Sequence, residues 1–232
     1  MSKRVAISQS NYIPWKGYFD NIAFVDEFVL YDDMQYTKRD WRNRNKIKTA
    51  NGLKWLTVPV EVKGKFHQKI KDTKVSDPKW NLNHLDVLKN SYSKAQFFKE
   101  VFPFIQNLYY EAENILTISE INAFFIKSIC SFLNIETKIT FSSDYKIING
   151  GATEKLVAIC KQTKATDYYT GPAAKNYMDD SAFVKEGINV NYYDYSGYLE
   201  YNQLHGDFEH GVTILDLIFN KGKDSYKYLK FS

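Results

Sequence analysis

The chain has 232 residues, of which 44% are hydrophobic and 25% are charged, and its formal net charge is +4. This is the composition of an ordinary soluble globular protein, and the charge is too small to predict non-specific binding of nucleic acid. The N-terminus lacks the apolar core of a signal peptide, and no apolar run reaches membrane-spanning length. We therefore expect a cytoplasmic protein without a membrane span.

The first 33 residues predict a strand, a helix and a second strand. Short apolar runs at residues 4–8 and 27–33 are typical of buried strands, and residues 16–26 place Phe19, Ile22 and Ala23 at helical spacing. Such a βαβ unit requires parallel pairing of its strands. Residues 53–62 are a third strand candidate, in which Pro59 favours an edge or irregular position.

Residues 79–134 read as a helical insert of amphipathic helices, broken near Pro103 and restarted near Ser119. Ser119 is a partial N-cap candidate, because Asn122 stands where the glutamate of a capping box would be. Strands at 137–144, 166–171 and 188–195 then alternate with helices at 152–165 and 172–187. This order predicts an α/β fold with a mainly parallel, Rossmann-like sheet and a helical insert, in one domain over residues 1–232.

Two cysteines, Cys130 and Cys160, stand alone in apolar stretches without the spacing of metal ligands. We expect them to be buried free thiols, and the sequence predicts no metal site. The chain also lacks a nucleophile elbow, a P-loop and a GxGxxG motif.

Polar residues follow several of the predicted strands, at the edge where ligands of open parallel sheets bind. Four segments, at residues 8–12, 32–45, 142–144 and 170–177, should therefore meet at one edge. The residues that we expect to bind substrate are Gln9, Asn11, Tyr12, Trp15, Gln35, Lys38, Arg39, Arg42, Asn43, Arg44, Asn45, Ser142, Ser143, Asp144, Tyr169, Gly171, Lys175 and Tyr177.

The most polar of these segments interleaves arginines with Trp41 and two amides. Arginine forks match phosphate and carboxylate geometry, and several of them together suit a diphosphate. The alternatives are a solvated loop with locally paired charges, and a nucleic-acid groove, for which no recognised module is present. In the last segment, Gly171 and Pro172 start a predicted helix, and the free N–H groups of its first turn could bind an anion. The alternative is that this Gly-Pro turn has only a structural role.

The candidate general bases are His84, Asp32 and Asp33. An unperturbed histidine, or a carboxyl group whose pKa is raised by burial, could accept a proton near neutral pH. A structural role is the alternative for His84, and His205 and His210 flank the sequence GDFE without an assigned role. No residue stands out as a covalent nucleophile. If the protein transfers a group between two substrates, we therefore expect direct transfer while both are bound in a ternary complex, without a covalent enzyme intermediate.

Six segments resemble, in order, the motifs of the WbqC-like proteins: QSNYIPWKGYF, FVLYDDMQYTKRDWRNRNKIKT, WLTVPV, SSD, YYTGPAAKNYMD and LDLIFNKG. Ser10 departs from the proline that the family usually has after Gln9. The resemblance implies biosynthesis of bacterial lipopolysaccharide or O-antigen, by transfer of an acyl or aminoacyl group to a nucleotide-linked amino sugar. The expected ligands are that sugar nucleotide and the acyl donor, with no cofactor. Nucleic acid is not an expected partner, and the oligomeric state stays open, a homodimer included.

Residues 10–31 are also similar in layout to the HxGH nucleotidylyltransferases of the HUP type. Trp15 and Tyr18 stand where that superfamily has its two histidines, which stabilise charge on the transferring phosphate. Their replacement argues against adenylyl transfer. Nucleotidylyl transfer, adenylate formation, and a non-catalytic sugar-nucleotide-binding subunit are the alternative functions.

Overall fold

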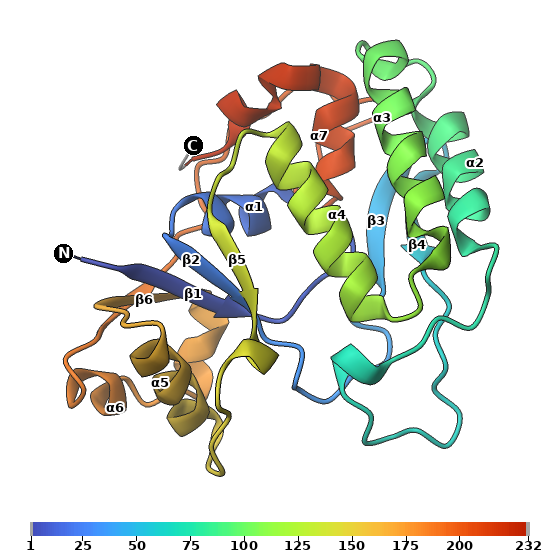
Figure 1. Ribbon diagram of the computed structural model, residues 1–232. Helices are drawn as coiled ribbons and strands as arrows, with labels where there is room; N and C mark the ends of the chain where they lie inside the picture. The colour runs from blue at the N-terminus through green and yellow to red at the C-terminus, as the bar shows by residue number, and fades with distance from the viewer. Residues whose placement is uncertain (1, 231–232) are drawn as a thin grey trace.

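A computed structural model describes residues 2–230, and within them five strands form one parallel sheet (Figure 1). The strands are β1 (Arg4–Ser8), β2 (Glu27–Leu30), β5 (Lys138–Phe141), β6 (Asp167–Thr170) and β7 (Asn189–Tyr192), paired in the order β5-β2-β1-β6-β7. If these five strands are renumbered 1 to 5 in chain order, their order across the sheet is 3-2-1-4-5, which is the order of a Rossmann fold. The prediction of a mainly parallel, Rossmann-like α/β fold is confirmed.

Helices cover both faces of this sheet. The helices α1 (Lys16–Ala23), α4 (Ile118–Phe132) and α7 (Ile214–Lys221) contribute to one core, and α5 (Ala152–Gln162) and α6 (Asp180–Val184) to the other. In β1 the side chain of Ala6 belongs to the first core, and those of Val5 and Ile7 to the second. A strand buried on both faces needs a continuous apolar run rather than alternation, which is why the first strands stood out in the sequence.

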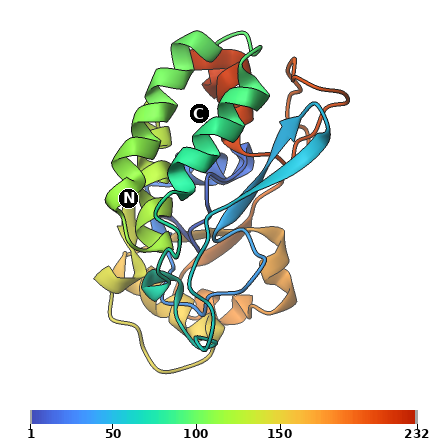
Figure 2. The ribbon, with the colours of Figure 1, turned by 90° about the vertical axis from the view of Figure 1, so that its right-hand side faces the viewer.

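The connection from β2 to β5 contains an antiparallel hairpin and the helical insert. The hairpin joins β3 (Arg44–Thr49) to β4 (Gly52–Thr57), and the insert consists of α2 (Trp80–Tyr92), α3 (Phe98–Glu111) and α4. In Figure 2 the hairpin projects beside a loop of the C-terminal segment. The strand expected at 53–62 therefore ends at Thr57 and pairs outside the main sheet, and β3 was not predicted.

Two predicted features of the insert are wrong. Pro103 lies inside α3, and the helices are separated instead at residues 93–97, where the Phe97 N–H donates to the carbonyl of Phe219. The cap of α4 is Thr117, whose hydroxyl accepts from the Glu120 N–H at 3.3 Å and donates to the Glu120 carboxylate at 2.8 Å. The N-cap thus lies two residues before Ser119, and Glu120 is its partner in the first turn.

Toward the C-terminus, the helix expected at 172–187 is divided. A 3₁₀ turn, Pro172–Asn176, precedes the short α6, and α7 was not predicted. Cys130 and Cys160 are buried free thiols, as predicted, and burial raises the pKa of Cys130 to about 12. None of the helices within residues 2–230 is both long enough and apolar enough to cross a bilayer.

A buried carboxylate at the amino end of the sheet gives a first testable prediction. Glu27 is 1% exposed and accepts hydrogen bonds from Lys3 at 2.7 Å, from Lys138 and Thr140 at 3.1 Å each, and from Tyr145. Burial alone would raise the pKa of Glu27, but these donors outweigh it and lower the pKa from 4.5 to about 2.

Replacing Glu27 by Gln should therefore lower the free energy of unfolding by about 3 kcal/mol at neutral pH. Because the folded-state pKa is depressed, this difference should be complete above about pH 4.5 and should disappear as the pH falls toward about 2. Urea unfolding of both proteins across this range measures it. A difference that does not change with pH would contradict the assignment.

Candidate ligand-binding site at the carboxyl edge of the sheet

The carboxyl ends of β1, β2 and β5 are joined by hydrogen bonds between polar side chains. One carboxylate oxygen of Asp32 accepts from the backbone N–H of Ser10 at 2.8 Å, which links the ends of β1 and β2. The carboxylate of Asp33 accepts from the hydroxyl of Ser142 at 2.8 Å, which links β2 and β5. Segments far apart in the sequence thus meet at this edge, as parallel strands require.

Asp32 is the centre of a buried network. It is 2% exposed, and its second oxygen accepts from the hydroxyl of Ser119 in the first turn of α4. The Asn122 amide donates to the Ser10 hydroxyl at 3.0 Å and to the Arg42 carbonyl at 2.8 Å. Both oxygens of Asp32 are therefore engaged in holding the β1 loop against α4.

Asp33 is paired with two lysines. Its carboxylate lies 3.1 Å from the Lys69 ammonium and 2.7 Å from that of Lys71. Burial would raise the pKa of Asp33, but the hydrogen bonds from Lys71, Ser142 and Lys69 outweigh it and lower the pKa. This is the opposite of the near-neutral pKa that a carboxylate base needs.

His84 lies inside an aromatic cluster at the base of the helical insert. One ring nitrogen is 2.8 Å from the Tyr12 hydroxyl and the other is 3.1 Å from the Thr57 carbonyl. The nitrogen facing the carbonyl must carry the proton, so the other accepts from Tyr12. Burial against rings such as Trp80 lowers the pKa of His84 to about 4. The structure therefore gives His84 no open nitrogen toward a ligand.

The arginine-rich segment divides between a loop and the hairpin. On the outer face of the hairpin, the Arg44 guanidinium lies 4.1 Å from the ring centre of Trp55, and the Lys46 ammonium lies 5.4 Å from it. Trp41 packs on Trp55 with ring centres 5.3 Å apart. Alternation along β3 places Asn45 on the opposite face, where its amide donates to the carbonyls of Tyr12 and Ile13.

The other predicted binding residues are spread over this edge. Asn43 is buried and donates to the Val58 carbonyl, and Arg42 donates to the Ser10 carbonyl at 3.3 Å. Gln35 donates to the Phe66 carbonyl, and Tyr169 packs against Phe24. The Gln9 carbonyl accepts from Tyr18. Exposed positions are Lys38, Arg39, Ser143, Asp144, Lys175 and Tyr177, whereas Gly171 is partly buried. The structure does not bring all of these residues into one cavity.

A cavity of about 330 Å³ gathers part of the set, and we call it the Trp15–Trp41 pocket. Backbone hydrogen bonds assemble its walls from three parts of the chain: Tyr12 N–H to Trp41 carbonyl at 3.0 Å, and Ile214 N–H to Pro14 carbonyl at 2.8 Å. Its lining consists of Asn11, Pro14, Trp15, Trp41, Asn45, His210 and Gly211.

Lys16, beside this pocket, was not predicted as a functional residue. It is 3% exposed, donates to the Leu199 carbonyl at 2.8 Å, and lies 4.9 Å from the ring centre of Tyr198 and 5.6 Å from that of Phe208. Burial lowers the pKa of Lys16 to about 8. A lysine at a helix start is ordinarily solvated, so the sequence carried no signal of this aromatic enclosure.

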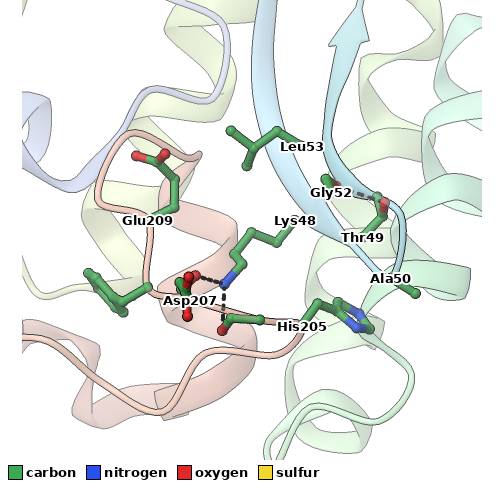
Figure 3. A pocket seen from close by; sticks show the side chains of 10 residues that line it. Lys48, Thr49, Ala50, Gly52, Leu53, His205, Asp207 and Glu209 are labelled. Atoms are coloured by element: carbon green, nitrogen blue, oxygen red, sulfur yellow. Dashed lines mark hydrogen bonds between the residues drawn. The ribbon is translucent and has the colours of Figure 1, made fainter.

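A second cavity, of about 440 Å³, lies between the turn of the hairpin and residues 205–209 (Figure 3). The Lys48 ammonium crosses it and donates to the backbone carbonyls of Gly206, at 3.4 Å, and Asp207. His205 is held by the Ser91 carbonyl at 3.0 Å. These contacts fix the C-terminal segment along the hairpin, and with it the wall of the first pocket that carries His210.

Comparison with known proteins gives two matches. A model of the WbqC-like protein family matches residues 9–228. The chain is 50% identical over 229 residues to a Mycobacterium tuberculosis protein named "Uncharacterized protein Rv1507c", and the match covers 99% of this chain and 98% of that protein. No solved structure matches the chain.

Proposed function

Because the chain belongs to the WbqC-like protein family, we propose that it transfers an acyl or aminoacyl group to the amine of a nucleotide-linked sugar. The product would serve the biosynthesis of a bacterial surface polysaccharide. The observation that carries the proposal is the Trp15–Trp41 pocket, with the cations of Arg44 and Lys46 on the adjoining face of the hairpin. Aromatic walls beside paired cations match a ligand with a flat or ring-shaped end and a diphosphate.

The pocket supports a specific placement of this ligand. Its volume suits a base or a sugar ring rather than a whole sugar nucleotide, and Trp15 and Trp41 would pack against that ring. The diphosphate would then lie along the hairpin, within reach of Arg44 and Lys46. Lys38 and Arg39, exposed on the loop that precedes the hairpin, extend the positive charge of this edge.

Replacing Trp41 by Ala should weaken binding of the sugar nucleotide about 5- to 150-fold, because stacking on an aromatic ring contributes about 1 to 3 kcal/mol. Titration calorimetry with UDP-, GDP- and dTDP-linked amino sugars measures the loss. Phe66→Ala is the matched control, since Phe66 is 73% exposed and does not line the pocket. Equal affinity of the Trp41 variant and the wild type would remove the pocket from the proposal.

The reaction itself is tested by supplying the bound amino sugar with acyl-thioester and aminoacyl-ester donors and following the product mass. Sugar-nucleotide binding without turnover would favour a non-catalytic binding subunit. Release of pyrophosphate from ATP would favour the HUP-type alternative, which the Rossmann strand order also favours. Against that alternative, Trp15 lines the pocket, and Tyr18 is buried with its hydroxyl donating to the Gln9 carbonyl at 3.0 Å.

A further inference from the structure

His210 is placed to exchange a proton with a ligand in the Trp15–Trp41 pocket. It lines the pocket, its side chain is exposed, and neither ring nitrogen makes a hydrogen bond within the described residues. The other histidines are placed differently. Both nitrogens of His84 are engaged, His205 is held by a backbone carbonyl, and His67 is exposed on a loop beside Phe66.

Asn11, in the lining of the same pocket, has an unpaired acceptor that a small rotation of its side chain would turn toward a ligand. The side-chain oxygen of Asn11 is buried and has no hydrogen-bond partner among residues 2–230. An unsatisfied buried carbonyl carries a desolvation cost that a ligand N–H or O–H can relieve. An acceptor and a free imidazole in one cavity are the two groups that a primary amine needs, one to orient it and one to take its proton.

We propose that the amine of the acceptor sugar enters this pocket, where Asn11 accepts one of its N–H bonds and His210 is the general base. This inference rests on the proposed function. As the amine nitrogen forms its bond to the donor's carbonyl carbon, the bond from that carbon to the ester or thioester leaving group breaks. The proton of the amine passes to the imidazole of His210 and from there to the leaving oxygen or sulfur.

The surroundings of His210 keep it neutral and in place. Partial burial lowers the pKa of His210, the positive charge of Lys16 on α1 lowers it further, and Glu200 and Glu209 of its own segment oppose these effects. The net shift is downward from 6.5, so the imidazole can accept a proton at pH 7. The ring packs edge to face on Phe208, with centres 4.6 Å apart, and Lys16 contacts the same Phe208 ring.

The test compares His210→Gln with His67→Gln, a histidine outside the pocket. His210→Gln should bind the sugar nucleotide within about threefold of wild type but lower kcat about 100-fold or more. The wild-type rate should rise with pH through an apparent pKa below about 6.5, and this rise should be absent from His210→Gln. Asn11→Ala should raise KM for the acceptor, while His67→Gln should behave as wild type.

Nuclear magnetic resonance of the histidine rings separates this inference from the proposed function. Addition of the amino-sugar nucleotide to the wild type should shift the His210 signals, whereas the N-acetylated analogue should shift them much less. If the wild type transfers acyl groups and His210→Gln transfers them equally fast, the proposed function stands and His210 is not the base. If no donor supports transfer, the proposed function fails, and unmoved His210 signals then overturn the pocket assignment as well.

Discussion

Asp32→Ala should lower the free energy of unfolding by about 2 to 5 kcal/mol, because two buried donors lose their acceptor at once. These donors are the Ser10 N–H and the Ser119 hydroxyl, which tie the β1 loop to the first turn of α4. Urea unfolding followed by circular dichroism measures the loss. A variant as stable as the wild type would show that the network does not hold these elements together.

Asp32→Asn separates this structural role from catalysis. The asparagine oxygen can accept from the Ser10 N–H, and its amide can donate to the Ser119 oxygen, so we expect a loss of only about 1 kcal/mol. If Asp32 only holds the loop, Asp32→Asn should keep its transfer rate. A folded Asp32→Asn protein that binds sugar nucleotide without turnover would instead support the catalytic role expected from the sequence.

Gly17→Ala should disrupt the Trp15–Trp41 pocket, although alanine is favoured over glycine in a helix by about 1 kcal/mol. A Cβ atom at Gly17 would lie 2.3 Å from Cζ2 and 2.6 Å from Cη2 of Trp15, so the indole must move. Trp15 would then lose its edge-to-face contacts with Tyr195 and Tyr198. We expect a loss of about 1 to 3 kcal/mol in unfolding free energy and at least tenfold weaker sugar-nucleotide binding.

A double-mutant cycle tests this cause. In a Trp15→Ala background the clash is absent, so adding Gly17→Ala should stabilise the protein rather than destabilise it. Gly151→Ala is the matched single control, because a Cβ there would approach only the flexible end of Glu154. If Gly17→Ala costs the same with and without the indole, the steric explanation is wrong.

The parallel sheet could be predicted because its strands are short apolar runs separated by helical periodicity. Strand β3 could not be predicted, because its inward-facing residue Asn45 is polar and its outward-facing residues Arg44 and Lys46 are charged. Asn45 faces inward because it donates to two loop carbonyls, and Arg44 and Lys46 face tryptophan rings. Such contacts depend on tertiary structure, and the pattern of hydrophobic residues along one strand does not predict them.

The candidate site was only partly predictable for the same reason. The polar residues after β1 and β2 could be placed at one edge from the parallel topology alone. Which histidine is accessible could not be predicted. The two hydrogen-bond partners of His84 are Tyr12 and Thr57, and both are distant from it in sequence. His210 lies in a segment without regular periodicity. Only the backbone hydrogen bonds of this segment to the β1 loop and the hairpin, from Ile214 and Thr213, give it a place in the pocket.

The closure of this pocket by the C-terminal segment makes ligand binding depend on contacts between distant parts of the chain. Thr213 donates its N–H to the Lys46 carbonyl and its hydroxyl to the Ile13 carbonyl, across 167 and 200 positions. Contacts over such separations form only after long loops have closed. A folding chain should therefore gain its affinity for ligand only when the β1 loop, the hairpin and the C-terminal segment have come together.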